Sequence, residues 1–364
     1  MKILVVGNNS DGLYRFRKDL LLELVLKNND VYVVTPFDEC IHELKTLGIN
    51  LIELKIDRRG TNFLREVVLL FKYYKILRNI KPDLVITYTI KPNIYCGWLC
   101  SLLRIKYVCN ITGLGTTFQK DNMLKRIVMV LYKIALRKVK VVFFENKENF
   151  DIFVNKRIIN KENGALLHGA GVNTEEFEFV KYPIQKDNIK FLFIGRIMKE
   201  KGIEEFMYVA KKIKKENSNI QFDIVGPMED DYVNIINEFQ EKKIINYYGF
   251  QKDVRPFIES CHCFVLPSYH EGMANTLLEA GAMGRPLITS NIYGCKEAIN
   301  NNGYVVNVRD RDDLYRKIKK FIALSYDEKK QMGIRSRNHI SQVFDKKKVV
   351  QETIKGLNLW MNIK

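Results

Sequence analysis

Residues 189–211, with the sequence IKFLFIGRIMKEKGIEEFMYVAK, contain the pattern that decides the fold. A short apolar run at residues 189–194 stops at Gly195, and a helix-forming run begins at residue 203. A buried strand, a glycine turn and a helix form the repeating unit of a parallel sheet with helices on its faces. The turn residues Arg196 and Lys201 therefore follow the carboxyl end of a strand, where open parallel sheets bind their ligands.

The same alternation of apolar strands and amphipathic helices recurs on both sides of this stretch. In the first half we expect strands at residues 3–6, 31–35, 51–56, 84–88, 107–111 and 141–144, and helices at residues 13–27, 63–78, 94–103 and 123–138. After residue 211 we expect strands at residues 221–225, 247–248, 263–266, 286–289 and 304–306.

A polar stretch at residues 174–188 separates the two series and is the expected linker. The sequence thus predicts an α/β protein of two Rossmann-like, doubly wound domains, residues 1–173 and 189–345, which face each other across a cleft. Residues 346–364 form an expected C-terminal helix that is a candidate to cross back to the first domain.

The charge of the chain indicates which kind of partner it binds, and its cysteine content indicates the cellular compartment in which it works. The net charge is +17, and residues 1–172 hold 28 Lys and Arg against 16 Asp and Glu, which is +12. This excess suggests an anionic partner, which could be a phosphate-rich substrate, an acidic membrane surface or nucleic acid. The seven cysteines have no disulfide or zinc spacing, and neither a signal peptide nor a membrane span is recognisable. A cytoplasmic location fits best.

The turn at Gly195 has the residue types of a diphosphate clamp. Arg196 offers a bidentate guanidinium, and Lys201, five residues later, offers a mobile point charge. The alternative is two ordinary surface cations, an interpretation that the next motif weakens.

That motif is PSYHEGMANTLLEA at residues 267–280, which follows an expected strand. Glu271 stands in a loop, where its carboxylate can accept hydrogen bonds from sugar hydroxyls. Glu279, eight residues later, falls in the first turns of a helix and can hold ribose hydroxyls. The N–H groups at the start of this helix would point at an anion; they belong to Gly272, Met273, Ala274 and Asn275. The alternative is that both carboxylates only stabilise the helix dipole.

Three loops in the first half should open on one edge of the first sheet, because each follows an expected strand. Their candidate acceptor or cleft residues are Asn8, Thr89, Lys91, Asn93, Thr112, Gly113 and Gly115. Gly113 and Gly115 match part of a dinucleotide-binding pattern, but Phe118 replaces its third glycine. We therefore expect no cofactor.

The order of these motifs resembles glycosyltransferase family 4, which comprises retaining enzymes with the two-domain GT-B fold. The similarity covers nearly the whole chain and is closest to the branch that builds capsules, O-antigens and protein-linked glycans. The matched elements are Gly-Arg-x4-Lys-Gly at residues 195–202, Glu-x7-Glu at 271–279, Thr-x-Lys-Pro-Asn at 89–93, Thr-Gly-Leu-Gly at 112–115, Phe-Arg at 16–17 and the segment 169–173.

This resemblance implies the roles of the site residues. Arg196 and Lys201 would hold the diphosphate, Glu271 would contact the donor sugar as the catalytic residue, and Glu279 would bind ribose. Arg17 joins the acceptor-side loops. The resemblance further implies a UDP-sugar donor, a polyprenyl-diphosphate-linked saccharide acceptor and work at the inner face of a membrane.

Two departures from the family are present. The loop at residues 112–115 lacks the histidine that many members have. A Pro-Arg pair, common in this branch after Glu-Gly-Met, is replaced by Ala274-Asn275, which puts the sugar or acceptor preference in doubt.

The chemistry needs positive charge at the leaving phosphate, and protein cations with a helix end can supply it without a metal. Asp310-Arg311-Asp312 has the Asp-x-Asp spacing but precedes a helical run, so we expect a helix cap and no metal site. Cations near apolar residues at helical spacing, such as Arg126 and Lys133, suggest a basic amphipathic helix on an anionic membrane. A core helix with a solvated cationic rim is an equal alternative.

Two other functions stay open. A nucleotide-sugar epimerase can share this architecture and would need no acceptor. A nucleic-acid binder is suggested by charge alone, but no recognisable binding module supports it, and we expect no nucleic acid among the partners.

Overall fold

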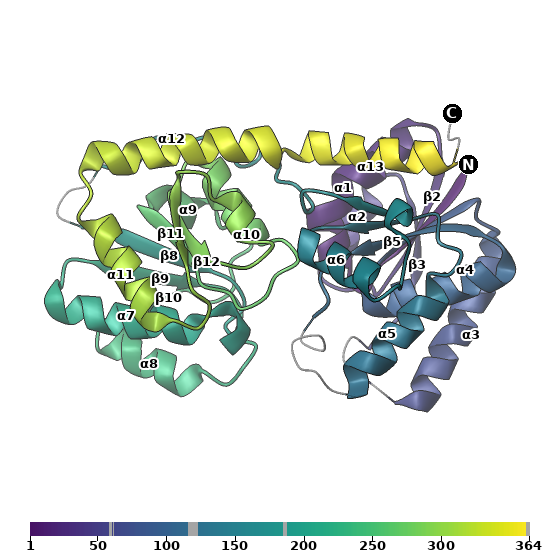
Figure 1. Cartoon of the computed structure of the whole chain (residues 1–364), viewed down its shortest axis with the longest axis horizontal. Helices are drawn as coiled ribbons and strands as arrows, with labels where there is room; N and C mark the ends of the chain where they lie inside the picture. Colours follow the sequence, from purple (N-terminus) through teal and green to yellow (C-terminus); the bar gives the residue numbers. More distant parts are fainter. Residues whose placement is uncertain (58–59, 61, 116–122, 185–187, 362–364) are drawn as a thin grey trace. The chain divides into compact units, whose positions relative to one another are not determined.

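The structure, a computed structural model, describes residues 1–57, 60, 62–115, 123–184 and 188–361. The chain forms two compact units (Figure 1): Met1–Ala170 with Lys346–Lys364, and Gly171–Asp345. Each unit contains one parallel sheet covered by helices. In the part of the chain that is described, no helix is both long and apolar enough to cross a lipid bilayer.

The sheet of the first unit has seven strands in the order β3-β2-β1-β4-β5-β6-β7. They are β1 (Lys2–Val6), β2 (Asp30–Thr35), β3 (Asn50–Glu53), β4 (Leu84–Tyr88), β5 (Lys106–Ile111), β6 (Val141–Phe144) and β7 (Gly164–Leu166). Since β1 pairs with both β2 and β4, the strand order reverses beside β1. Doubly wound sheets bind ligands at the carboxyl edge of such a reversal.

Helices cover both faces of this sheet. On one face α1 (Ser10–Leu26), α2 (Ile41–Lys45) and α13 (Lys346–Met361) enclose an apolar core that includes Leu20, Leu44 and Leu357. The core of the other face includes Tyr73, Leu99 and Tyr132. That second face is covered by α3 (Phe63–Ile80), the π-helical turn η1 (Pro92–Cys96), α4 (Gly97–Leu103), α5 (Met123–Ala135) and α6 (Lys147–Asn155), and a short turn η3 (Lys161–Asn163) precedes β7.

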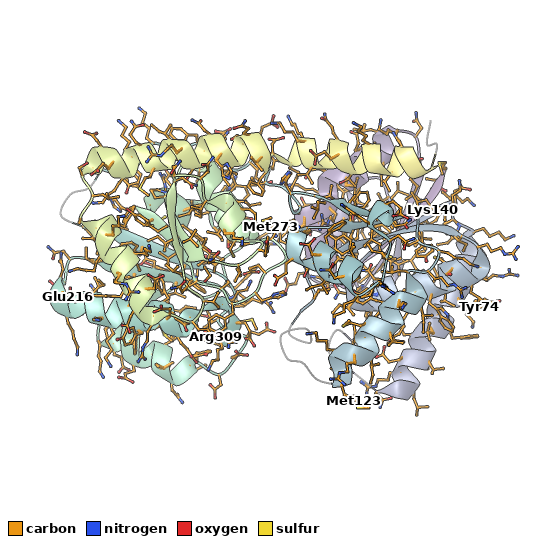
Figure 2. The ribbon with its side chains drawn as sticks, in the orientation of Figure 1. Tyr74, Met123, Lys140, Glu216, Met273 and Arg309 are labelled. Carbon is orange, nitrogen blue, oxygen red and sulfur yellow. The ribbon has the colours of Figure 1, made fainter. Side chains whose placement is uncertain are left out.

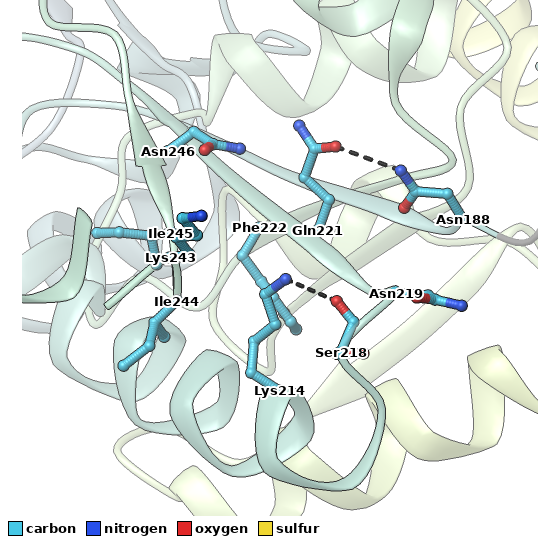
Figure 3. Close-up of a pocket in the computed structure, with 10 residues that line it drawn as sticks. All are labelled: Asn188, Lys214, Ser218, Asn219, Gln221, Phe222, Lys243, Ile244, Ile245 and Asn246. Carbon is cyan, nitrogen blue, oxygen red and sulfur yellow. Dashed lines mark hydrogen bonds between the residues drawn. The ribbon is translucent and has the colours of Figure 1, made fainter. Parts of the chain in front are cut away.

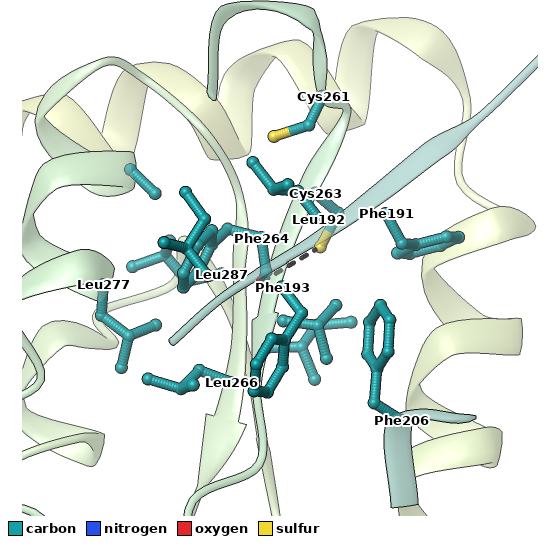
Figure 4. Close-up of a cluster of buried hydrophobic side chains, with 14 of the residues drawn as sticks. Phe191, Leu192, Phe193, Phe206, Cys261, Cys263, Phe264, Leu266, Leu277 and Leu287 are labelled. Carbon is teal, nitrogen blue, oxygen red and sulfur yellow. Dashed lines mark hydrogen bonds between the residues drawn. The ribbon is translucent and has the colours of Figure 1, made fainter. Parts of the chain in front are cut away.

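The sheet of the second unit has six parallel strands in the order β10-β9-β8-β11-β12-β13. They are β8 (Lys190–Ile194), β9 (Gln221–Val225), β10 (Asn246–Tyr247), β11 (Cys263–Leu266), β12 (Leu287–Ser290) and β13 (Gly303–Val306). Aromatic residues such as Phe191, Phe193 and Phe206 help to fill its core (Figure 4). Phe191 stacks on Phe222 at 5.3 Å between ring centroids, and Phe206 meets Phe222 edge-on at 5.6 Å. This packing fixes β8, the strand that carries the Gly195 turn.

Helices also flank this second sheet, and α7 packs against α11 while α10 packs against α12. Their bounds are α7 (Ile203–Glu216), α8 (Val233–Glu241), α9 (Arg255–Ser260), α10 (Asn275–Ala282), α11 (Arg311–Ile322) and α12 (Tyr326–Val343), with short turns η4 (Lys199–Lys201) and η5 (Lys296–Ala298). The Asp-x-Asp motif caps a helix as expected, because the Asp310 carboxylate accepts the N–H of Asp313 at 2.8 Å.

The segment expected as a linker belongs to the second unit in this structure. Two arginines fasten it. Arg337 donates to the carbonyls of Thr174 and Phe177, and Arg285, fully buried, donates to those of Val180 and Lys181. Residues 185–187 of the expected linker lie outside the described residues.

Candidate active site

The candidate donor-side site lies on the carboxyl edge of the second sheet, where two loops pack tightly together. The first follows β8 and ends at Gly202, whose φ of 75° is left-handed. A Cβ atom at Gly202 would lie 2.2 Å from the carbonyl oxygen of Pro267, in the loop that follows β11. Only glycine permits this close approach, so the loop that carries Arg196 and Lys201 is held against the loop that carries Glu271.

Lys201 and Glu271 meet at this junction. Lys201 Nζ lies 2.5 Å from Glu271 Oε1, and the two side chains are only 18% and 10% exposed. The Ser268 hydroxyl donates to the same carboxylate oxygen at 2.8 Å. The sequence suggested separate roles for these two residues, and the structure makes them neighbours. The carboxylate is therefore positioned by a cation and by a hydroxyl group.

Arg196 lies at the outer part of the same loop. Its side chain is 45% exposed, and its guanidinium Nη1 is 3.4 Å from Glu229 Oε1. Ion pairs this exposed contribute little free energy, so the guanidinium can exchange its partner for an incoming phosphate at small cost.

The start of α10 differs in one respect from the expectation. The N–H of Ala274 donates to the carbonyl oxygen of Gly294 at 2.8 Å, so it is not available to an anion. This hydrogen bond forms because the loop after β12 packs on the loop that carries Glu271. A Cβ atom at Gly294 would lie 2.4 Å from the carbonyl oxygen of Gly272. Met273 and Ala274 have buried side chains, so contacts from these residues would come from the backbone.

The side chains of Asn275, the first residue of α10, and of Glu279, one turn later, are both half-buried. They are four residues apart and therefore lie on one side of the helix. The Asn275 Oδ1 atom is buried and has no hydrogen-bond partner. Thr276 donates to the carbonyl of Ile194 at 3.2 Å, which ties this turn to the end of β8.

Sequence reasoning missed two features of this edge. Gly294 is one, and the available signal was a glycine five residues after the expected strand at 286–289. The other is Tyr269, whose hydroxyl donates to Glu205 on α7 at 2.7 Å while the Arg309 guanidinium lies 4.7 Å from its ring centre. No local pattern predicts these contacts, because the partners are far apart in the chain.

The candidate acceptor-side residues gather on the carboxyl edge of the first sheet, after β1, β4 and β5. Asn8 is half-buried in the turn between β1 and α1. Arg17 on α1 forms an ion pair with Glu145 at 2.5 Å, and its guanidinium lies 4.7 Å from the ring centre of Tyr88. Burial acts to lower the pKa of Arg17, but the charge and hydrogen bond of Glu145 together with Tyr88 outweigh it, and the net shift is upward.

The Thr89–Asn93 loop is partly structural. Asn93 is fully buried, and its side chain bonds Thr87 at 2.6 Å and the Asn110 carbonyl at 2.9 Å, so it joins β4 to β5 and has no surface for a ligand. Lys91 forms an ion pair with Glu66 of α3 at 2.5 Å. Thr89 has a φ of 71°, a strained value for a β-branched residue, and its buried hydroxyl has no partner.

The loop after β5 completes this edge. Thr112 and Gly113 are half-buried and Gly115 is exposed. Phe118, which replaces the third glycine of the dinucleotide pattern, lies outside the described residues.

A pocket of about 680 Å³ in the second unit lies away from this chemistry (Figure 3). Its lining includes Gln221 and Asn246, the first residues of β9 and β10, so it opens at the amino edge of the sheet. A five-residue strand separates the two edges by roughly 16 Å. The pocket is therefore distinct from the Lys201–Glu271 junction.

Comparison with known proteins agrees with this geometry. Residues 174–339 match the family described as Glycosyl transferases group 1, and residues 2–146 match that described as Glycosyl transferase 4-like. One relative is the N,N'-diacetylbacillosaminyl-diphospho-undecaprenol alpha-1,3-N-acetylgalactosaminyltransferase of Campylobacter jejuni, 26% identical over 92% of each chain. Another is the UDP-Gal:alpha-D-GlcNAc-diphosphoundecaprenol alpha-1,3-galactosyltransferase of Escherichia coli, 23% identical over 84% of this chain and 82% of the relative.

Among solved structures, Anabaena HepE in complex with UDP and glucose superposes with a TM-score of 0.79, at 15% identity, over 99% of this chain and all of HepE. The shared fold is GT-B. With two family matches that together span both units, the chain belongs to the group 1, family 4-like glycosyltransferases.

Proposed function

We propose that this glycosyltransferase moves a hexose or N-acetylhexosamine from a UDP-sugar to a saccharide carried on polyprenyl diphosphate, with retention of configuration and without a metal. The two relatives are named for undecaprenol-diphosphate-linked acceptors, and the second is also named for a UDP-Gal donor. A role in bacterial surface polysaccharide or glycan synthesis, at the inner face of the membrane, follows from such an acceptor.

One observation carries the donor part of this proposal: the contact between Lys201 and Glu271. In a nucleotide sugar, the diphosphate and the sugar are joined through a single oxygen atom. A protein that binds both at the reacting bond needs a phosphate-binding cation and a sugar-binding carboxylate side by side. Lys201 Nζ and Glu271 Oε1, 2.5 Å apart, meet this requirement.

The chemistry follows from the charges at this point. As the glycosyl bond opens, negative charge grows on the leaving phosphate and positive charge on the sugar ring. Arg196 and Lys201 would stabilise the phosphate more in the transition state than in the ground state. The Glu271 carboxylate would accept hydrogen bonds from sugar hydroxyls, and Glu279, one turn into α10, would hold ribose. Front-side attack assisted by the leaving phosphate accounts for retention with no protein nucleophile.

The test is a transfer assay with purified protein, a panel of UDP- and GDP-sugars, and undecaprenyl-diphosphate-linked saccharide in vesicles. We expect a lipid product heavier by one sugar, formed equally well with a chelator present, and an α-linkage by NMR from an α-linked donor. Loss of transfer with chelator that magnesium or manganese restores would contradict the metal-independent mechanism.

One control distinguishes a glycosyltransferase from the alternative, a nucleotide-sugar epimerase. Incubation with donor alone should leave the sugar configuration unchanged, whereas an epimerase would convert it. Salt-sensitive DNA binding without any response to nucleotide sugars would instead favour a nucleic-acid binder.

A further inference from the structure

Exposed apolar side chains concentrate on one layer of the first unit. Of the 24 large hydrophobic side chains that are exposed among the described residues, 12 lie on α3, α4 and α5. We call the outward side of these helices the apolar face; it is marked by Leu64, Val68 and Phe71 on α3 and by Ile127, Val130 and Ile134 on α5. A cluster of this kind on a water-soluble surface marks a contact site.

The apolar residues follow helical spacing, so they form stripes. On α3 they are four and three residues apart, and on α5 three and four, which places each set along one side of its helix. The opposite sides of the same helices, with Tyr73 and Tyr132, are buried in the core. Each helix is therefore apolar on two sides, and the described part of the chain covers only one of them.

The three helices form one layer. They cover the same face of the sheet, and α4 packs against both α3 and α5. Trp98 and Leu102, one turn apart on α4, are exposed as well, at 41% and 64%. Figure 2 labels Tyr74 and Met123, whose side chains lie on the outside of α3 and α5.

The charges on this layer are almost all positive. The helices α3 and α5 carry seven lysines and arginines and one acid, Glu66. That acid forms an ion pair with Lys91, at 14% and 15% exposure, so it does not offset the outward charge. Lys75 lies 4.7 Å from the ring centre of Phe71, which mixes cation and apolar surface at close range.

We propose that the apolar face docks on an anionic phospholipid bilayer, with its apolar side chains entering the boundary between headgroups and acyl chains and its cations meeting the lipid phosphates. A second copy of this chain is a poorer occupant, because two such faces would bring fourteen cations together. The choice of a bilayer rests on the proposed function, since a polyprenyl-linked acceptor is anchored in a membrane.

The probe is vesicles of phosphatidylglycerol and phosphatidylethanolamine, compared with pure phosphatidylcholine vesicles, in a sedimentation assay without sugar or nucleotide. We expect binding to the anionic vesicles that weakens with salt. Ile127→Ser with Val130→Ser should weaken it about tenfold or more, because binding strength scales with the apolar area buried. Lys72→Gln with Lys133→Gln should weaken it about 30-fold, which corresponds to roughly 1 kcal/mol for each cation.

Matched controls come from the second unit. Val233→Ser with Ile235→Ser changes exposed apolar residues of α8, and Lys215→Gln with Lys330→Gln changes exposed cations of α7 and α12. Both pairs should bind vesicles as the unchanged protein does. Equal losses in the controls, or no binding to anionic vesicles at low salt, would overturn the proposal. The proposal would also be overturned if the unchanged protein were a dimer and the Ile127→Ser and Val130→Ser changes dissociated it while vesicle binding stayed normal.

Two measurements on the same variants distinguish a failure of the docking proposal from a failure of the proposed function. A thermal shift with UDP reports the donor site and the fold in the same variants. Normal UDP response with no vesicle binding by the unchanged protein would reject the docking face alone, whereas vesicle binding without any transfer activity would reject the proposed function alone.

Discussion

The ion pair between Lys201 and Glu271 gives the sharpest test of the site, through a double-mutant cycle of Lys201→Met and Glu271→Gln. The pair is close, at 2.5 Å, and mostly buried, at 18% and 10% side-chain exposure. Removing one partner of such a pair leaves a poorly solvated charge, whereas removing both removes that penalty. We therefore expect a coupling free energy of unfolding of about 1.5–3 kcal/mol.

The matched control is a surface pair between the same loop and the first turn of α7. Lys199 and Glu204 are 3.5 Å apart, with side chains 61% and 43% exposed. Water screens this pair, so Lys199→Met and Glu204→Gln should couple by less than about 0.5 kcal/mol. Urea unfolding of each single and double variant, monitored by circular dichroism, supplies both numbers. Equal coupling in the two cycles would refute the account of a buried, positioned carboxylate.

The same variants separate binding from turnover. Lys201→Met should weaken UDP binding, because it removes the phosphate contact. Glu271→Gln should leave UDP binding intact, since it frees Lys201 from its partner, yet lower turnover about 100-fold or more, a loss typical of removing a preorganised polar contact to the transition state. Near-normal turnover of Glu271→Gln would remove the role assigned to this residue. Unchanged UDP affinity in both Lys201→Met and Arg196→Gln would contradict the hypothesis that these two cations bind the diphosphate.

Four further outcomes can be measured by urea unfolding or UDP titration. Asn93→Leu, which breaks the buried join between two strands, should destabilise the protein by about 2–4 kcal/mol and leave UDP affinity unchanged. Arg285, whose pKa is lowered by burial, donates to five backbone carbonyls, so Arg285→Met should cost about 3 kcal/mol or more and Arg285→Lys should recover less than half. Burial, with the nearby charge of Arg285, lowers the pKa of His262 to about 4. The unfolded chain therefore binds this proton first, and stability should fall by up to about 3 kcal/mol as the pH drops from about 6.5 to 4, a loss that His262→Gln should reduce. Gly202→Ala, which forces a Cβ atom against Pro267, should weaken UDP binding about tenfold or more and destabilise the second unit.

Much of the fold could be predicted from local patterns. The expected helix at residues 123–138 appears as α5 (Met123–Ala135), and the expected strand at 84–88 is β4. The patterns are informative because buried parallel strands are continuous apolar runs and their helices repeat every 3.6 residues. The strand expected at 51–56 was too long: β3 ends at Glu53, because its partner strand β2 ends at Thr35, the residue paired with Glu53.

The site could be predicted only as a set of residue types. The motifs placed Arg196, Lys201, Glu271 and Glu279 after strands, and parallel topology then brings them to one edge. The motifs could not predict the hydrogen-bond partners of these residues. The N–H of Ala274 is taken by a carbonyl twenty residues away, and Asn93 is a core residue, because the packing of loops and strands decides which polar groups reach solvent.

The sequence by itself determined most of the strands and several of the helices, the basic excess of the first half and the residues at the strand ends, because these features depend on residues that are close together in the chain. It did not reveal β7, α2 or α6. Only the tertiary structure decided that Lys201 meets Glu271 and that α3 and α5 expose a second apolar side. Helical periodicity reports which residues share a side of a helix. Whether that side is covered depends on neighbours brought there from distant parts of the chain.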